Sequence, residues 1–171
     1  MANNIIESAA SVITPEALKA HWQGHRGLSR RIIENFPEKE LFEFSIGGMR
    51  PFAMLALEMT DLAQGGVRGL ATGNWSYGPG IPRYMDEARG GINTKADLLA
   101  LWDEVTADIE QYFPQIAPER WQQVEKAFGM YENTNIGTFH YLLENEIHHR
   151  GQGYVYLRAL GIEPTPFWER G

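Results

Sequence analysis

Hydrophobic residues recur every three to four positions in four long segments of the chain, which is the spacing of helices with one buried face. The first segment begins at Thr14, which can cap a helix whose first position is Pro15. It ends near Phe36, before Pro37. This segment therefore predicts a helix over about 15–36.

The second segment follows Gly47-Gly48 and carries apolar residues at helical spacing, namely Phe52, Leu55, Met59 and Leu62. The Gly65-Gly66 pair is expected to end this helix, because glycine is a weak helix former.

The third and fourth segments have clear signals at one end. Thr94 and Asp97 have the spacing of a capping box, and the apolar pattern that follows continues to about Tyr112. The fourth segment spans about 137–160 and is followed by Gly161, a residue typical of a helix C-terminus. Four long helices predict an all-α bundle.

Two connecting stretches are unusually long. Residues 69–93 are rich in glycine and proline. So long a connection in a bundle indicates a packed structural loop, a cover over a site, a dimer contact or an insertion with its own small strand. Residues 113–136 are irregular, with a short helix expected from Pro118.

Composition narrows the class of protein. A length of 171 residues with 43% hydrophobic residues fits a single domain over 1–171. The absence of cysteine excludes disulfides, a thiolate nucleophile and cysteine zinc sites. Apolar runs are too short to span a membrane, and residues 1–17 lack the pattern of a secretory signal. We therefore expect a cytoplasmic protein with no membrane partner.

The net charge of −7 argues against nucleic acid as a partner, because a nucleic-acid binder normally presents a basic face to phosphates. The densest basic cluster is Arg26, Arg30 and Arg31. Such a cluster indicates a solvated helix face, or alternatively a local anion site.

A helical wheel of the last segment separates a polar side from an apolar one. The polar side carries His140, Glu144 and His148, which indicate a solvated face or, as a weaker alternative, a line of metal ligands. The side expected in the core carries Phe139, Leu143, Ile147, Tyr154 and Leu157. Glu146 and Arg150 fall within the apolar arc, where an ion pair is expected.

On the flank of the apolar arc, Asn145, His149, Gln152 and Tyr156 form a polar stripe. Polar side chains beside a core must find partners or line a wet pocket, so we expect His149 to point inward and His148 outward. His21 and His25, four residues apart on the first helix, are expected at the surface or in the core and not among ligands.

The run from Asn145 to Gln152, Asn-Glu-Ile-His-His-Arg-Gly-Gln, is followed by Leu160-Gly161 and resembles the C-terminal signature of the DinB/YfiT-like family. The resemblance implies a four-helix bundle of the DinB/YfiT type with a long loop between helices 2 and 3, commonly a homodimer. Many members hold nickel or zinc through three histidines, one from the second helix and two, four residues apart, from the last helix.

This chain keeps one of those three histidines, His149. Asn145 stands four residues before it, and Glu58 stands at the second-helix position. A Glu–Asn–His set favours harder ions such as manganese over nickel or zinc. Alternatively, Glu58 pairs with a protonated His149 and no metal is needed.

Three functions remain open from the sequence. The first is a metal-assisted transferase or hydrolase that acts on a small molecule, with a divalent metal (Ni, Zn or Mn) on Glu58, Asn145 and His149. The second is a metal-free small-molecule-binding or stress-associated dimeric protein without catalysis, and the third is a structural dimer module. No catalytic residue is identified. The residues expected to contact a ligand are Gln152, Tyr156 and Trp75.

Overall fold

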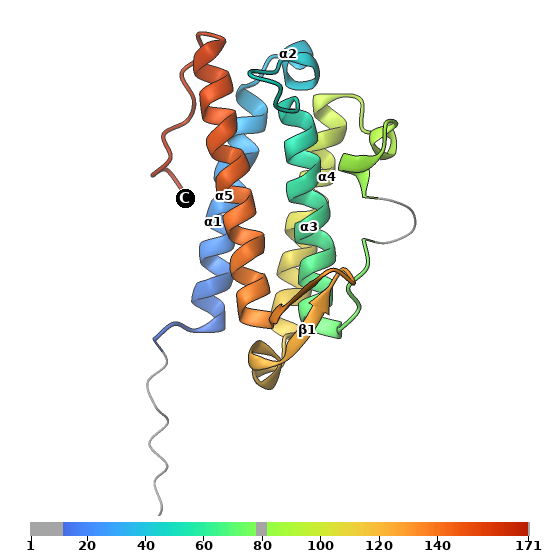
Figure 1. The fold of residues 1–171 in the computed structure, drawn as a ribbon. Helices are drawn as coiled ribbons and strands as arrows, with labels where there is room; N and C mark the ends of the chain where they lie inside the picture. The colour runs from blue at the N-terminus through green and yellow to red at the C-terminus, as the bar shows by residue number, and fades with distance from the viewer. Residues whose placement is uncertain (1–11, 78–81, 171) are drawn as a thin grey trace, which may run out of the picture.

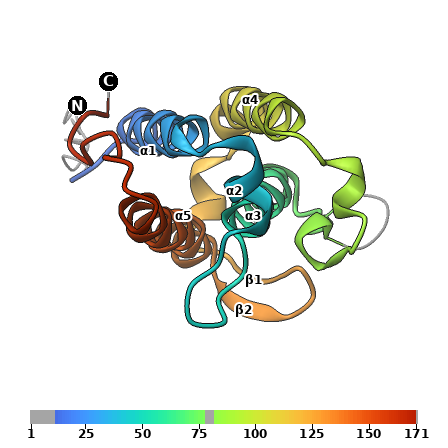
Figure 2. The ribbon, with the colours of Figure 1, turned by 90° about the horizontal axis from the view of Figure 1, so that it is seen from above.

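The computed structural model describes residues 12–77 and 82–170. The expectation that residues 1–17 hold no secretory signal lies largely outside the described residues, as do positions 78–81 of the predicted long loop. In the described part, four long helices pack side by side as a bundle (Figures 1 and 2), so the all-α prediction is confirmed. These helices are α1 (Pro15–Asn35), α3 (Phe52–Thr72), α4 (Lys95–Tyr112) and α5 (Asn135–Ala159).

The predicted helix starts are confirmed by their caps. The Thr14 side chain accepts a hydrogen bond from the Ala17 amide at 3.2 Å, and Thr94 and Asp97 form a reciprocal capping box at the start of α4. Helix α5 begins two residues earlier than expected, because Thr134 supplies its N-cap.

The predicted end of the second long helix is wrong. Helix α3 continues through Gly65 and Gly66 to Thr72 and ends at Gly73, whose φ of 79° is left-handed. The internal glycines serve close packing: a Cβ on Gly66 would lie 2.4 Å from Leu142 Cδ1, and one on Gly65 would lie 2.8 Å from Phe128 Cε1. A helix in which glycine is favoured by packing does not stop at glycine.

All four long helices contribute to one hydrophobic core. Its largest fully buried side chains include Trp22 from α1 and Trp102 from α4. Trp22 packs edge-on against Phe139 of α5 with ring centroids 5.6 Å apart, and Phe36 stacks on Phe52 of α3 at 4.7 Å. No helix in the described ranges is long and apolar enough to cross a membrane.

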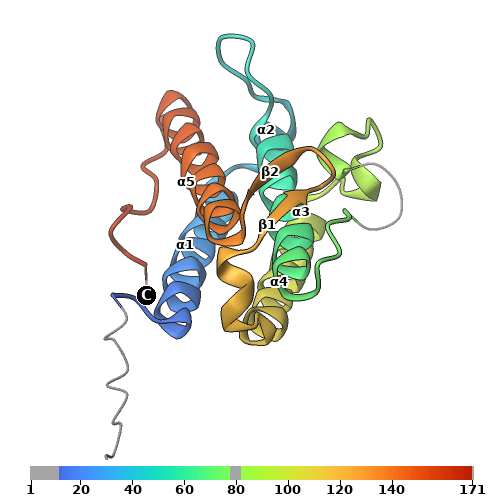
Figure 3. The same ribbon diagram turned by 60° about the horizontal axis from the view of Figure 1, so that its bottom comes forward.

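Smaller elements decorate the bundle. A short helix α2 (Glu38–Glu43) precedes α3, and an antiparallel hairpin of β1 (Val124–Ala127) and β2 (Tyr131–Thr134) precedes α5. The sequence did not indicate the hairpin, which crosses the ends of α3 and α5 (Figure 3). The short helix expected from Pro118 is present as a 3-10 helix over Pro118–Gln122; the other 3-10 helices are Arg83–Met85, Arg89–Gly91 and Phe113–Gln115.

Arg120 joins the hairpin to the end of α3. Its guanidinium donates to the carbonyl oxygens of Leu70 at 2.6 Å and Gly69 at 3.1 Å. The same group donates to Glu125 Oε2 of β1 at 3.0 Å. The side chain therefore caps the Leu70 carbonyl and adds a second donor to the Gly69 carbonyl, which also accepts from the Gly73 amide at 2.8 Å.

The described part of the long loop packs against α3. Arg83 forms an ion pair with the buried Asp61, and the Tyr84 amide donates to Asp61 Oδ2 at 3.2 Å. These contacts favour a structural loop for residues 82–84.

Three side-chain placements expected from the sequence are wrong. Ile147 is 39% exposed, whereas Arg26, expected on a solvated face, is fully buried with its guanidinium on the Trp102 ring. The ion pair of Glu146 is with Arg26, with 3.6 Å between Oε2 and Nη1; Arg150 instead contacts Ser29 and His25. Long-range partners on α1 and α4 decide these placements, and a helical wheel contains no information about them.

Candidate functional site

Glu58 lies in the second turn of α3 and faces α5. Its Oε1 atom is 3.1 Å from His149 Nε2 and accepts a hydrogen bond of 3.1 Å from Asn145 Nδ2. The side chains of Glu58 and His149 are 15% and 8% exposed. The structure therefore brings together the three residues that the sequence singled out, one from α3 and two from successive turns of α5.

The second carboxylate oxygen of Glu58 is held by Arg50, which stands just before α3 and forms an ion pair with it. Burial of Glu58 by itself raises its pKa. Hydrogen bonds and opposite charges from His149 and Arg50 outweigh the burial and lower the pKa from 4.5 to about 2. The carboxylate is therefore ionised at neutral pH.

His149 is held at both ring nitrogens. Nε2 faces Glu58, and Nδ1 lies 2.7 Å from Gln152 Oε1, while Gln152 Nε2 contacts Met49 Sδ at 3.5 Å. Each ring nitrogen therefore has an oxygen atom within hydrogen-bond distance. The result is a continuous polar chain from Arg50 through Glu58 and His149 to Gln152. We call these four residues and Asn145 the Glu58 network.

The two remaining residues expected at the site lie apart from the Glu58 network. Tyr156 is fully buried, and its hydroxyl donates to the Arg50 carbonyl at 2.9 Å, so it fixes the backbone that carries Arg50. Trp75 lies at the hairpin, where its Nε1 donates to Glu125 Oε2 at 2.6 Å and its ring contacts Phe128. Neither side chain is directed at Glu58 or His149 by these contacts.

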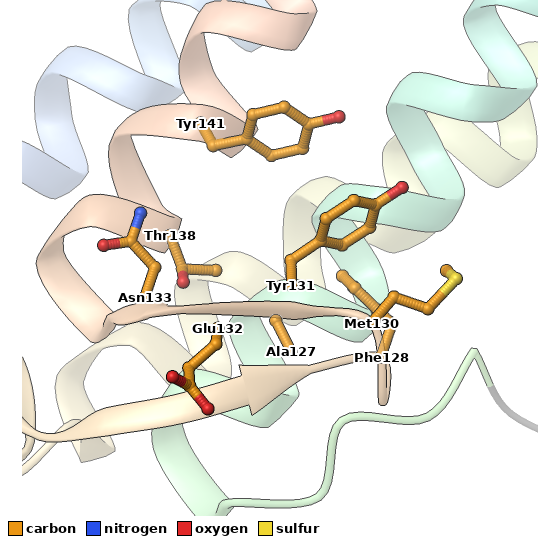
Figure 4. A pocket seen from close by; sticks show the side chains of 8 residues that line it. All are labelled: Ala127, Phe128, Met130, Tyr131, Glu132, Asn133, Thr138 and Tyr141. Atoms are coloured by element: carbon orange, nitrogen blue, oxygen red, sulfur yellow. The ribbon is translucent and has the colours of Figure 1, made fainter.

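A hollow of about 370 Å³ lies between the hairpin and α5. Its lining residues are Ala127, Phe128, Met130, Tyr131, Glu132, Asn133, Thr138 and Tyr141. Tyr131 and Tyr141 are both half exposed, with ring centroids 6.0 Å apart, and their hydroxyls point toward α3 (Figure 4). Tyr141 lies one helical turn before Asn145, so the hollow and the Glu58 network share one side of α5.

Figure 2 shows that the hairpin and the segment between α2 and α3, which carries Arg50, project from the same side of the bundle. Burial raises the pKa of the Tyr141 hydroxyl, and Tyr131 and the Glu58 carboxylate raise it further. The Tyr141 hydroxyl therefore lies within electrostatic range of Glu58.

Comparisons with known proteins agree with this architecture. The model of the DinB family matches residues 87–170. Residues 87–170, just under half of this chain, are therefore similar to the DinB family. A DinB-like protein from Bacillus subtilis has a similar structure, with a TM-score of 0.67 and 20% identity over 89% of this chain and 96% of the other. A DinB-like protein from Bacillus cereus gives a TM-score of 0.65 and 15% identity over 90% and 97%. No curated protein matches the chain.

The DinB-like resemblance implies a metal on three histidines, and the residues present do not fit one. A metal ligand needs a free lone pair, but the ring nitrogens of His149 already face Glu58 and Gln152. Arg50 occupies the other side of the Glu58 carboxylate, and its positive charge opposes a cation there. Asn145 Oδ1 is buried without a partner; turning the amide to aim this oxygen at the site would place it against the Glu58 carboxylate.

The weaker metal alternative concerned the outer face of α5. His140, Glu144 and His148 are exposed there. Across residues 12–77 and 82–170, no group of three or more histidine and acidic side chains is arranged to hold a metal ion.

Sequence reasoning missed Arg50 and the two tyrosines of the hollow. Arg50 carries a weak signal, since it directly precedes Pro51 at the start of α3, eight residues before Glu58. Tyr131 had none, because it belongs to a hairpin that the sequence did not indicate.

Proposed function

We propose that this protein binds a small molecule without a metal, on the side of α3 and α5 that carries the Glu58 network. One observation supports the proposal most directly: both carboxylate oxygens of Glu58 are engaged by protein groups, Oε2 by Arg50 and Oε1 by His149 and Asn145. Charge and hydrogen bonding within the chain replace what a cation provides in relatives that hold a metal.

The ligand we propose has an apolar body and a polar end. Its body fits the hollow beside Tyr131 and Tyr141, whose volume of about 370 Å³ lies in the usual range of small-molecule sites. Its polar end reaches toward Arg50, which is 42% exposed and retains donors beyond its contact with Glu58. Tyrosine suits such a site, because it joins a large apolar ring to a hydrogen-bonding hydroxyl.

The competing function is the metal-assisted transferase or hydrolase, with the metal on Glu58, Asn145 and His149. Untagged protein is incubated with Mn²⁺, Ni²⁺ and Zn²⁺ in turn, dialysed, and analysed for bound metal. We expect well under one equivalent. Near-stoichiometric metal that disappears in Glu58→Gln would support the competing function and overturn ours.

A gain-of-function variant provides the positive control. Glu58→His combined with Asn145→His places two histidines beside His149, which restores the set of three. The double variant also removes the partner of Arg50. We expect this double variant to take up close to one equivalent of nickel or zinc, since imidazole binds both well. Uptake by the variant and not by the parent would locate the difference in these two positions.

Ligand binding is tested by thermal shift with a library of small amphipathic compounds. Hits should stabilise the parent and lose that effect in Tyr141→Ala, while Trp168→Ala on the opposite side of α5 serves as the matched control. A library with no hit that is sensitive to Tyr141→Ala, or stabilisation by divalent ions alone, would contradict the proposal.

Homodimer formation and a cytoplasmic location are part of the same proposal. The DinB-like resemblance supports the dimer, and exposed apolar side chains on α5, such as Val155 at 56%, agree with it. Sedimentation equilibrium at several concentrations tests the assembly, and a monomer at micromolar concentration would remove the dimer from the proposal. A role in stress responses rests on the resemblance alone.

A further inference from the structure

A second polar cluster lies between α1 and α5, and none of its residues belongs to the Glu58 network. Its members are His25, Arg26, Ser29, Glu146 and Arg150, and all five are buried. Ser29 Oγ donates to Glu146 Oε1 at 2.7 Å, and Arg26 Nη1 lies 3.6 Å from Glu146 Oε2. We call these five residues the Glu146 cluster.

The positive charges in this cluster outnumber the negative ones. Arg150 donates to Ser29 Oγ at 3.2 Å and to His25 Nδ1 at 2.9 Å, so the His25 nitrogen must be unprotonated. Burial and the charge of Arg150 lower the pKa of His25 to about 4, and the ring is therefore neutral at pH 7. Two guanidinium groups then face one carboxylate, which leaves one positive charge unbalanced.

Arg150 also lines a hollow of about 370 Å³ on the outer side of α5. The chain after α5 turns back along the bundle beside α1 and α5 (Figures 1 and 2) and forms the other wall. Tyr154 ties this wall to the helix, because its hydroxyl donates to the Thr165 carbonyl at 2.7 Å. Trp168, 69% exposed, supplies an aromatic surface in the same hollow.

A second arginine, Arg158, also lines this hollow. Arg158 contacts Glu163 at 3.3 Å, but the two side chains are 56% and 82% exposed, so the pair is weak and solvent-screened. Glu163 is the acidic side chain among the lining residues, and it is free to turn toward water. The hollow therefore has two arginines among its lining residues, the nearly buried Arg150 and the exposed Arg158, beside an aromatic wall. Glu163 is paired with Arg158, and the carboxylate of Glu169 lies within electrostatic range of Tyr154.

We propose that this hollow binds a small organic anion, an arylalkyl carboxylate or a compound of the same chemistry. The carboxylate pairs with Arg150 and Arg158, because guanidinium groups match a carboxylate in geometry and charge. The ring of the anion packs against Tyr154 and Trp168. Such an anion balances the charge that Glu146 leaves uncompensated, which gives the site a reason to select an acid over a neutral compound.

The test uses phenylacetate as the probe and phenylacetamide as its neutral counterpart, in isothermal titration calorimetry at low salt. We expect phenylacetate to bind at least about tenfold more tightly than the amide, since hydrogen bonds to charged groups are the stronger ones. Equal affinity for the two compounds would overturn the proposal.

Two surface variants locate the binding without disturbing the core. Trp168→Ala and Arg158→Gln should each weaken phenylacetate binding by about threefold to tenfold and leave the melting temperature of the free protein unchanged. Tyr141→Ala, in the hollow on the other side of α5, is the matched control and should bind phenylacetate as the parent does. Arg150→Met should abolish binding, and circular dichroism establishes whether that variant is folded.

Three further results would overturn the inference. The first is a loss of phenylacetate binding in Tyr141→Ala but not in Trp168→Ala, which would move the acid to the other hollow. The second is no detectable binding to the parent at millimolar phenylacetate. The third is a dimer that dissociates in Trp168→Ala, in a protein that does not bind phenylacetate. The hollow would then belong to a contact between two copies of the chain.

Discussion

The Glu58 network and the Glu146 cluster flank the same helix, α5, but differ in exposure and in charge. Arg50, which completes the Glu58 network, is 42% exposed, so water screens that network. Arg26 and Glu146 are 0% and 2% exposed, and water does not reach them. Changing a polar side chain should therefore alter the free energy of unfolding much more in the Glu146 cluster than in the Glu58 network.

This difference separates two roles for buried polar groups. The Glu146 cluster fixes how α1 packs on α5, since its hydrogen bonds have one geometry and cannot be replaced by water. The Glu58 network is partly accessible and lies beside a hollow, so its charged groups can interact with a bound ligand. Substitutions in one cluster at a time separate these two roles.

The largest effect is expected for Glu146→Gln. The substitution keeps the shape of the side chain and removes the only carboxylate of the cluster. The two buried guanidiniums lose this counter-charge, and only the weaker attraction of Asp103 for Arg26 remains. We expect a loss of about 3–5 kcal/mol in the free energy of unfolding, measured by urea denaturation. Glu144→Gln, on the exposed face half a turn earlier, is the control and should change stability by less than about 0.5 kcal/mol.

The second prediction concerns pH. His25 has a pKa of about 4 in the folded protein and 6.5 when unfolded, so the unfolded chain binds a proton more readily between these values. Stability should fall by roughly 2–3 kcal/mol as pH decreases from 6.5 to 4, and no such cost exists above 6.5.

His25→Asn keeps an acceptor for Arg150 and cannot become charged. Its stability should therefore be flatter over this pH range than that of the parent, whereas the exposed His21→Gln should follow the parent. Identical pH profiles for the parent and His25→Asn would show that His25 does not carry the effect.

Glu58→Gln should have a smaller effect, a loss of about 1–3 kcal/mol at pH 7, because the side chain accepts charge-assisted hydrogen bonds but is partly solvated. The folded-state pKa of Glu58 is lowered from 4.5 to about 2, so its contribution is complete above pH 4.5 and is lost as pH falls toward 2. The difference between the parent and the variant should shrink over that interval. A difference that is independent of pH would mean that shape, and not charge, explains it.

The smallest effect is expected for Asn145→Ala, about 1 kcal/mol or less. The variant loses the 3.1 Å hydrogen bond to Glu58 but also removes Asn145 Oδ1, which is buried without a partner. Two opposing contributions should therefore nearly cancel in a denaturation experiment. A loss above about 2 kcal/mol would indicate that Oδ1 has a partner, such as bound water.

Local signals predicted the fold well where a single residue decides it. Thr14 and Thr94 mark the starts of α1 and α4 because a hydroxyl cap acts within one turn of the chain. The Gly65-Gly66 pair misled the prediction, since its neighbours Phe128 and Leu142 are more than sixty residues away in sequence. Packing against such distant neighbours is not written in the local pattern.

The site was predictable to the extent that spacing and resemblance carried it. His149 and Asn145 lie on one face of α5 because they are four residues apart. The family resemblance pointed to Glu58 as their neighbour, and the side chain of Glu58 contacts both. The partner of Arg26 could not be foreseen, because Glu146 follows it by 120 positions and the basic run of Arg26, Arg30 and Arg31 favoured a solvated helix face.

Arg120 gives the hairpin a mechanical role. One guanidinium donates both to the Gly69 and Leu70 carbonyls of α3 and to Glu125 of β1. Strand β1, which pairs with the strand that carries Tyr131, therefore cannot move without loosening the final turn of α3. Amide hydrogen exchange at residues 70–73 should thus slow when a compound fills the tyrosine-lined space. The end of a helix would then report on events at a strand, through a single side chain.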